Sequence, residues 1–239
     1  FLRDHWEAAY AQLMKFTEHD DESVRRLPSE GTRPRLPWGM GVPRLKKDPE
    51  PGLALIEQLR HDPSETVRRS VANHLNDIAK DHPDIVTETL RRWNREPATD
   101  PKMVSHALRT LIKNGDAGAL GVLGFTTDPE VEIEHFDVQP ATVGMGDRIE
   151  LAATVRSTAN QPQRLVVDFV IHHVNASGAT SPKVFKWATL DLEAGESATL
   201  TKRRLIQQAT TRTYRSGRHA VELKVAGSIA ASAAFTVEV

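Results

Sequence analysis

The stretch SVANHLNDIAKDHP, residues 70–83, places a carboxylate and two carboxamides where a helix normally avoids them. Its neighbourhood has apolar residues at helical spacing, namely Val67, Val71, Leu75, Ile78 and Ala79. The opposite face carries Arg69, Asn73, Asn76, Asp77 and Lys80. A fixed carboxylate such as Asp77 is able to oppose a developing positive charge and to accept a proton from water. The alternative is a solvated face on which Asp77 pairs with Arg69 or Lys80.

Residues 27–52 combine basic side chains with an aromatic ring. The segment holds six prolines and four glycines, so we expect neither a helix nor an ordinary strand there. Its cations are Arg33, Arg35, Arg44, Lys46 and Lys47, and they accompany Trp38. Cations interleaved with an aromatic ring favour phosphate contacts and base stacking. The alternative is a long solvated loop with a buried tryptophan.

The elements that must position these residues are predicted to be paired helices. Asp62 as N-cap, Pro63 at the first helical position and Glu65 as the capping-box partner predict one helix start. Asp100 and Pro101 repeat the pattern about 38 residues later. Helical pairs at this period are typical of HEAT repeats, which stack into a curved solenoid with a concave face.

The second half of the chain changes to short alternating β-branched runs separated by Gly-containing turns. About seven such runs predict an all-β, immunoglobulin-like sandwich without the usual disulfide, with Phe169 and Trp187 in its core. The chain is therefore expected to be multidomain, with an all-α HEAT-like solenoid over residues 1–128 and the sandwich over 129–239. Residues 27–52 are an insertion in the solenoid.

The sandwich has one strongly basic run, which comprises Lys202, Arg203, Arg204, Arg212, Arg215 and Arg218. Such a run is suited to DNA phosphates or the minor groove. The alternative is an exposed strand edge protected by charge. The sequence leaves both interpretations open.

The composition excludes several classes of protein. With no cysteine there is no disulfide framework and no thiolate zinc site, which fits a reducing compartment, and we expect a cytoplasmic protein. No apolar run reaches the roughly 18 residues of a membrane span. The ten histidines lack metal-ligand spacing, so we expect no metal and no cofactor. The chain opens at Phe1 already in helical register, and we expect it to be a fragment that lacks an upstream part.

The motifs SEGTRPRLPWG (29–39) and VRRSVANHLNDIAKDHP (67–83) together resemble the AlkC/AlkD-like HEAT-repeat DNA glycosylase family. The resemblance implies a HEAT-like domain followed by an immunoglobulin-like domain that assists DNA binding. It also implies excision of cationic N-methylated bases, such as 3-methyladenine and 3-methylcytosine, from double-stranded DNA with little or no base extrusion. By motif, Glu30, Trp38 and Asp77 match the family's catalytic positions. A further acidic residue of the family would lie before Phe1.

These residue types suit that reaction. A methylated cationic base is already a good leaving group, so the enzyme needs only to stabilise an oxocarbenium-like sugar and deliver water. Asp77 is expected to do so, helped by Glu30, while Trp38 offers a π face worth roughly 0.5–2 kcal/mol to a cation. Asn73, one turn before Asp77, is a candidate for orienting it. The expected DNA-binding residues are Arg33, Arg35, Lys46, Lys47, Arg69, Asn73, Lys80, Lys202, Arg203 and Arg204.

The leading interpretation is a monofunctional DNA glycosylase that acts as a monomer. The competing one is a non-catalytic HEAT-plus-sandwich module that binds nucleic acid or scaffolds other proteins, because most HEAT solenoids are scaffolds. The two differ in one structural respect: only an enzyme requires Glu30, Trp38 and Asp77 to converge on one site.

Overall fold

The computed structural model describes residues 2–37, 39–207 and 214–238. The chain divides into two compact units, Phe1–Asn114 and Gly115–Val239. The division falls earlier than the boundary expected after residue 128, because a short helix joins the second unit. Among the residues that the structure describes, no helix has both the length and the apolar character to cross a membrane.

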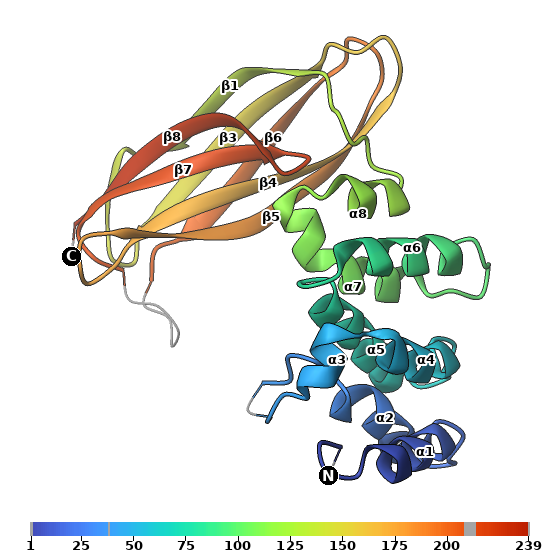
Figure 1. Ribbon diagram of the computed structural model, residues 1–239. Coiled ribbons are helices and arrows are strands. Elements are labelled where there is room, and N and C mark those ends of the chain that lie inside the picture. The colour runs from blue at the N-terminus through green and yellow to red at the C-terminus, as the bar shows by residue number, and fades with distance from the viewer. Residues whose placement is uncertain (1, 38, 208–213, 239) are drawn as a thin grey trace. The chain divides into compact units, whose positions relative to one another are not determined.

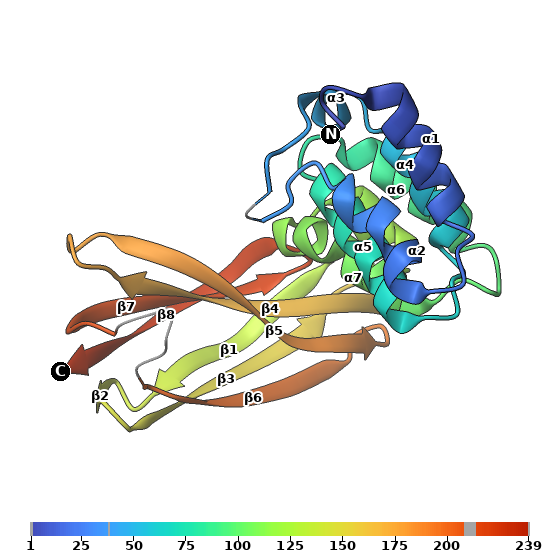
Figure 2. The same cartoon turned by 90° about the horizontal axis from the view of Figure 1, so that it is seen from below.

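The first unit consists of helices (Figure 1). They are α1 (Trp6–Phe16), α2 (Glu22–Gly31), α3 (Pro43–Lys47), α4 (Glu50–Leu59), α5 (Glu65–Ile78), α6 (Pro83–Trp93) and α7 (Pro101–Asn114). Helix α5 packs against α2, α4, α6 and α7. Figure 2 shows α2, α5 and α7 following one another along one side of the unit, with α1, α4 and α6 along the other.

The apolar face predicted for α5 is confirmed. Val67, Val71 and Leu75 are fully buried, as are their counterparts Val104 and Leu108 on α7. The opposite face of α5 is less solvated than is usual for a surface helix, since Asn76 and Asp77 are also buried. Burying such groups is costly unless they are hydrogen-bonded, so neighbouring helices must supply their partners.

The start of α5 differs from the prediction. The helix begins at Glu65 with Ser64 as its N-cap residue, not at Pro63 with Asp62 as the cap. The Asp62 carboxylate instead accepts hydrogen bonds from the Arg25 guanidinium, at 2.6 Å, and from the Ser64 backbone N–H, at 2.8 Å. The corresponding prediction for α7 is confirmed, because that helix begins at Pro101 and Asp100 accepts from the Lys102 backbone N–H.

The prediction that residues 27–52 lack helix is wrong at both ends. Helix α2 continues to Gly31 through Pro28, and α4 begins at Glu50, with α3 between them. Pro43 and Pro51 stand in the first turns of α3 and α4, where the missing N–H of proline has no helical partner to lose. The described residues of this segment that lie outside a helix are therefore 32–37, 39–42 and 48–49.

The second unit is a two-layer sandwich preceded by α8 (Ala117–Val122). Its strands are β1 (Val131–Gln139), β2 (Thr142–Gly144), β3 (Arg148–Ser157), β4 (Gln163–Val174), β5 (Thr180–Leu192), β6 (Ser197–Leu205), β7 (Gly217–Val225) and β8 (Ser228–Glu238). One sheet has the order β1-β3-β6 and the other β2-β8-β7-β4-β5. Phe169 is buried in the core as predicted, whereas Trp187 is partly buried and packs edge-on against it, with ring centroids 5.6 Å apart.

A buried histidine lies at the contact between α4 and α5. His74 is fully buried, and a Cβ added to Gly52 would lie 2.9 Å from its Nε2 atom. Glycine at this position therefore lets α4 approach the imidazole closely. Burial lowers the pKa of His74 from 6.5 to about 4, so the imidazole is neutral at neutral pH.

We expect Leu108→Ala to lower the free energy of unfolding of the helical unit by about 2–5 kcal/mol, because the side chain is fully buried and leaves a cavity. Leu27→Ala is the matched control, since Leu27 is 48% exposed, and it is expected to cost well under 1 kcal/mol by comparison. Urea unfolding followed by circular dichroism at 222 nm measures both. Equal losses for the two variants would contradict the packing described.

His74 makes stability depend on pH. Between pH 6.5 and about 4 the unfolded chain binds a proton that the folded chain does not, so the free energy of unfolding falls as the pH falls through this window. The full effect is about 3 kcal/mol. We expect His74→Gln to remove this part of the pH dependence. If the free energies of unfolding of the two proteins change in parallel between pH 7 and pH 4, the imidazole is not held neutral.

Candidate active site

Asp77 lies in the last turn of α5, and its side chain is only 3% exposed. Its Oδ2 atom accepts a hydrogen bond from Nε of Arg33 at 2.8 Å, and Nη2 of Arg33 forms an ion pair with the same oxygen, also at 2.8 Å. Its Oδ1 atom accepts one from Nζ of Lys80, at 3.0 Å. The buried carboxylate is thus paired with two cations, one from the loop after α2 and one from its own chain segment.

Glu30 lies at the end of α2 and faces the same guanidinium. Its Oε1 atom accepts from Nη1 of Arg33 at 2.7 Å, and Oε2 accepts from the Ser70 hydroxyl at 2.8 Å. Burial acts to raise the pKa of Glu30, but the hydrogen bonds from Ser70 and Arg33 outweigh it, so the pKa lies below its ordinary value. Ser70 lies on α5, two turns before Asp77, whereas Glu30 lies on α2.

The two carboxylates predicted to be catalytic therefore meet at one arginine. Trp38, the third residue of the prediction, lies outside the described residues. Sequence reasoning missed Ser70, although it stands on the α5 face that carries Asn73 and Asp77. Arg33 had been expected to bind DNA; in this structure each of its side-chain nitrogens faces a carboxylate.

Asn73 was expected to orient Asp77, but its side chain hydrogen-bonds to other residues. Its Oδ1 atom accepts from Nε2 of His106, at 3.0 Å, and from Nη2 of Arg109, at 3.1 Å, both on α7. The sequence analysis missed both α7 residues. Burial lowers the pKa of Arg109 while the charge of Asp77 acts to raise it, which places Arg109 within the electrostatic reach of the site. Asn73 thus links α5 to α7.

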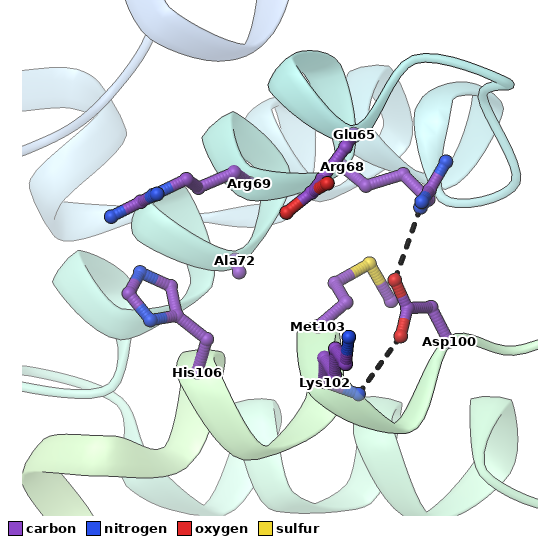
Figure 3. A pocket seen from close by; sticks show the side chains of 8 residues that line it. All are labelled: Glu65, Arg68, Arg69, Ala72, Asp100, Lys102, Met103 and His106. Atoms are coloured by element: carbon purple, nitrogen blue, oxygen red, sulfur yellow. Dashed lines mark hydrogen bonds and ion pairs between the residues drawn. The ribbon is translucent and has the colours of Figure 1, made fainter.

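A pocket of about 240 Å³ lies between α5 and α7 on this face (Figure 3). It is lined by Glu65, Arg68, Arg69, Ala72, Asp100, Lys102, Met103 and His106. Arg68 braces the two helices through Asp100, at 3.2 Å. Arg69 extends from α5 on the side of the pocket where His106 lies, and it is exposed, with no hydrogen bond or ion pair to any described residue.

The other cations predicted to bind DNA occupy several places. Arg35 is paired with Asp81 through two hydrogen bonds, at 3.0 and 2.7 Å. Lys46 and Lys47 are exposed on α3, and the backbone carbonyl of Lys46 is 2.9 Å from Nε2 of His82, which ties α3 to the start of α6. Lys46 and Lys47 therefore remain accessible, whereas Arg35 must leave Asp81 to bind an anion.

The basic run of the sandwich does not form a continuous stripe on one face. Lys202, Arg203 and Arg204 follow one another on β6, an edge strand of its sheet, so their side chains alternate between its faces. Arg203 pairs with Glu150 of β3, and the Arg204 guanidinium lies 3.8 Å from the ring centroid of Phe185. Lys202 and Arg203 are exposed, as are Arg215 and Arg218, while Arg204 is partly buried and Arg212 lies outside the described residues.

The site offers charge and hydrogen bonds. Within the described ranges no cluster of three histidine or acidic side chains is arranged to hold a metal ion. The arrangement also provides a pair of carboxylates fixed by one guanidinium. Such a pair is suited to stabilising a cationic transition state.

The comparisons with known proteins agree with this description. A family model for the C-terminal Ig-like domain of the uncharacterised protein YhaZ matches residues 132–239. YhaZ of Bacillus subtilis (strain 168) is 37% identical over 238 residues, which cover 99% of this chain and 66% of YhaZ.

A solved structure matches the whole chain. The Pseudomonas fluorescens alkylpurine DNA glycosylase AlkC, bound to DNA containing an abasic site analog, is 41% identical to this chain with a TM-score of 0.93. The match covers 100% of this chain and 67% of AlkC, so the chain spans about two thirds of the length of both relatives. The resemblance seen in the two motifs is confirmed: this chain belongs to the AlkC family of DNA glycosylases, and its second unit is an immunoglobulin-like domain.

Proposed function

We propose that this chain carries the excision site of a DNA-repair glycosylase. Its substrates are cationic N-alkylated bases in double-stranded DNA, such as 3-methyladenine and 3-methylcytosine, and its reaction is hydrolysis of the N-glycosidic bond. The observation that supports this most is the convergence of Glu30 and Asp77 on Arg33 from two helices. A scaffold has no need of that convergence. The row of α2, α5 and α7 corresponds in this proposal to the inner helices of a HEAT-like solenoid.

The chemistry follows from the charge of the substrate. A cationic base leaves as a neutral molecule, so no strong acid is needed, and the barrier lies in the positive charge that develops on the sugar. The Asp77 carboxylate opposes that charge. Its Oδ1 atom accepts one hydrogen bond, from Lys80, and a carboxylate oxygen has two acceptor positions. In this proposal the second position takes the hydrogen bond of the water molecule that attacks the sugar and gives up its proton.

The reaction proceeds in this proposal without a cofactor and without a lysine nucleophile. Lys80 donates a hydrogen bond to Asp77, and a lysine must lose its proton before it can attack a sugar carbon. DNA is held by the exposed cations near the site, Arg69, Lys46 and Lys47, with Lys80, Arg35 and the β6 residues Lys202 to Arg204 as further contacts. Trp38 supplies a stacking surface.

Asp77→Asn is expected to lower the single-turnover rate of 3-methyladenine release from methylated duplex DNA by about 100-fold or more. The reason is that the neutral amide no longer opposes the charge on the sugar or accepts the proton of water. The assay uses the protein at its full natural length, with enzyme in excess over DNA. DNA affinity, measured by fluorescence anisotropy, is expected to change little.

The matched control for this variant is Asp84→Asn, because Asp84 is an exposed carboxylate in the first turn of α6. Unchanged base release by the Asp77 variant would contradict a chemical role of this carboxylate. No release from the unmodified protein would favour the competing interpretation, a module that binds nucleic acid without acting on it.

Arg69→Ala is expected to weaken binding to duplex DNA, because this exposed guanidinium is free to contact a phosphate. The slope of log K against log salt concentration should fall by about 0.9 for one lost phosphate contact, with no change in the rate at saturating enzyme. Arg91→Ala is the control, since Arg91 is an exposed arginine of α6 paired with Glu88. A salt slope equal to that of the unmodified protein would remove Arg69 from the interface.

A further inference from the structure

The side chain of Arg33 is unusual among the basic residues of this face. It is 11% exposed, compared with 38% for Lys80 and 46% for Arg26. Its nitrogens face two carboxylates, with Nε and Nη2 on Asp77 and Nη1 on Glu30. A planar guanidinium is suited to this bridging arrangement, which a single ammonium group cannot reproduce.

The backbone around Arg33 is anchored. The preceding residue, Thr32, is fully buried, and its hydroxyl donates to the carbonyl of Pro28 at 2.6 Å. The backbone N–H of Arg33 donates to the carbonyl of Glu30 at 3.4 Å, and Pro34 on its other side is buried. The turn at the end of α2 therefore holds Arg33 next to the two carboxylates.

We propose that Arg33 is a positioning residue that holds Asp77 and Glu30 in one catalytic arrangement and does not bind a DNA phosphate. This inference rests on the proposed glycosylase function. Arg33 contacts Asp77 through Oδ2, by a hydrogen bond from Nε and an ion pair from Nη2, both at 2.8 Å. Oδ1 is therefore the oxygen that this proposal leaves to receive the proton of the attacking water. The same contact fixes the direction in which Oδ1 points.

The charges around the site support this assignment. If Arg33 turned away to a phosphate, two partly buried carboxylates would lose the cation that they share, which is unfavourable. The other charged or titratable groups near them include Arg26 from α2, Arg35 from the loop after α2, His74 from α5, Lys80 after it and Arg109 from α7. His74 is buried and neutral, and none of the described cations other than Arg33 hydrogen-bonds to both carboxylates.

The test compares Arg33→Lys, Arg33→Gln and the control Arg91→Ala by the single-turnover rate of base release and by affinity for DNA with an abasic-site analogue. We expect both Arg33 variants to release base about 100-fold more slowly, since small displacements of catalytic groups have effects of this size. Lysine should not rescue the rate, because it keeps the charge but not the bridge. Affinity should change less than about threefold in either variant, since no phosphate contact is lost.

A double variant separates positioning from simple loss of structure. When Asp77 is already Asn, Arg33→Gln should lower the remaining rate far less than it does alone, because the group that it positions is gone. The double variant also removes a positive and a negative charge together, which protects its folding, and circular dichroism checks that it folds. In the Arg33→Gln variant the pKa of Glu30, read by carbon NMR, should rise toward its ordinary value.

Three outcomes would overturn the inference. The first is a loss of DNA affinity and of salt slope with an unchanged rate, which would make Arg33 a phosphate ligand. The second is full activity of Arg33→Lys, which would show that only the charge matters. The third is an equal effect of Arg33→Gln with and without Asp77. If the unmodified protein releases no base while the pKa of Glu30 responds as described, the failure lies with the proposed function, and the catalytic part of the inference falls with it.

Discussion

The contact between one guanidinium and two carboxylates is the constraint on which the candidate site depends. Glu30 and Asp77 are two carboxylates that are largely shielded from water, and holding them together without a cation between them is unfavourable. Arg33 removes that conflict through hydrogen bonds at 2.7–2.8 Å. The buried Thr32, which fixes the turn before Arg33, and the Ser70 hydroxyl on Glu30 serve the same arrangement.

The packing of α2, α5 and α7 side by side explains why these polar groups keep their positions. Glu30 comes from α2, Asp77 from α5, and the Asn73 partners His106 and Arg109 come from α7. Three packed helices hold polar groups with less freedom than loops would. The apolar faces of the same helices are fully buried, so the core that stabilises the unit also determines which way the polar faces point.

Local features of this chain were predictable from sequence, and long-range ones were not. The apolar face of α5 follows from periodicity alone, and Glu30 and Asp77 were found by their motifs. Of the partners of Asp77, Lys80 was named among the alternatives, whereas Arg33 was missed because it lies 44 residues before Asp77 in the chain. The predicted cap of α5 was wrong for a similar reason, since Arg25, 37 residues before Asp62, binds that carboxylate. His106 and Arg109 gave no signal before α5 and α7 were placed side by side.

The most direct test of this account is a crystal structure of the protein bound to duplex DNA in which a cationic aza-sugar replaces the deoxyribose of the damaged nucleotide. The aza-sugar nitrogen stands where positive charge develops at the anomeric carbon. We predict that Oδ1 of Asp77 lies within hydrogen-bonding distance of that nitrogen or of a water beside it, with Arg33 still bound to both carboxylates. An Asp77 carboxylate remote from the sugar, or an Arg33 that has moved to a phosphate, would contradict the account.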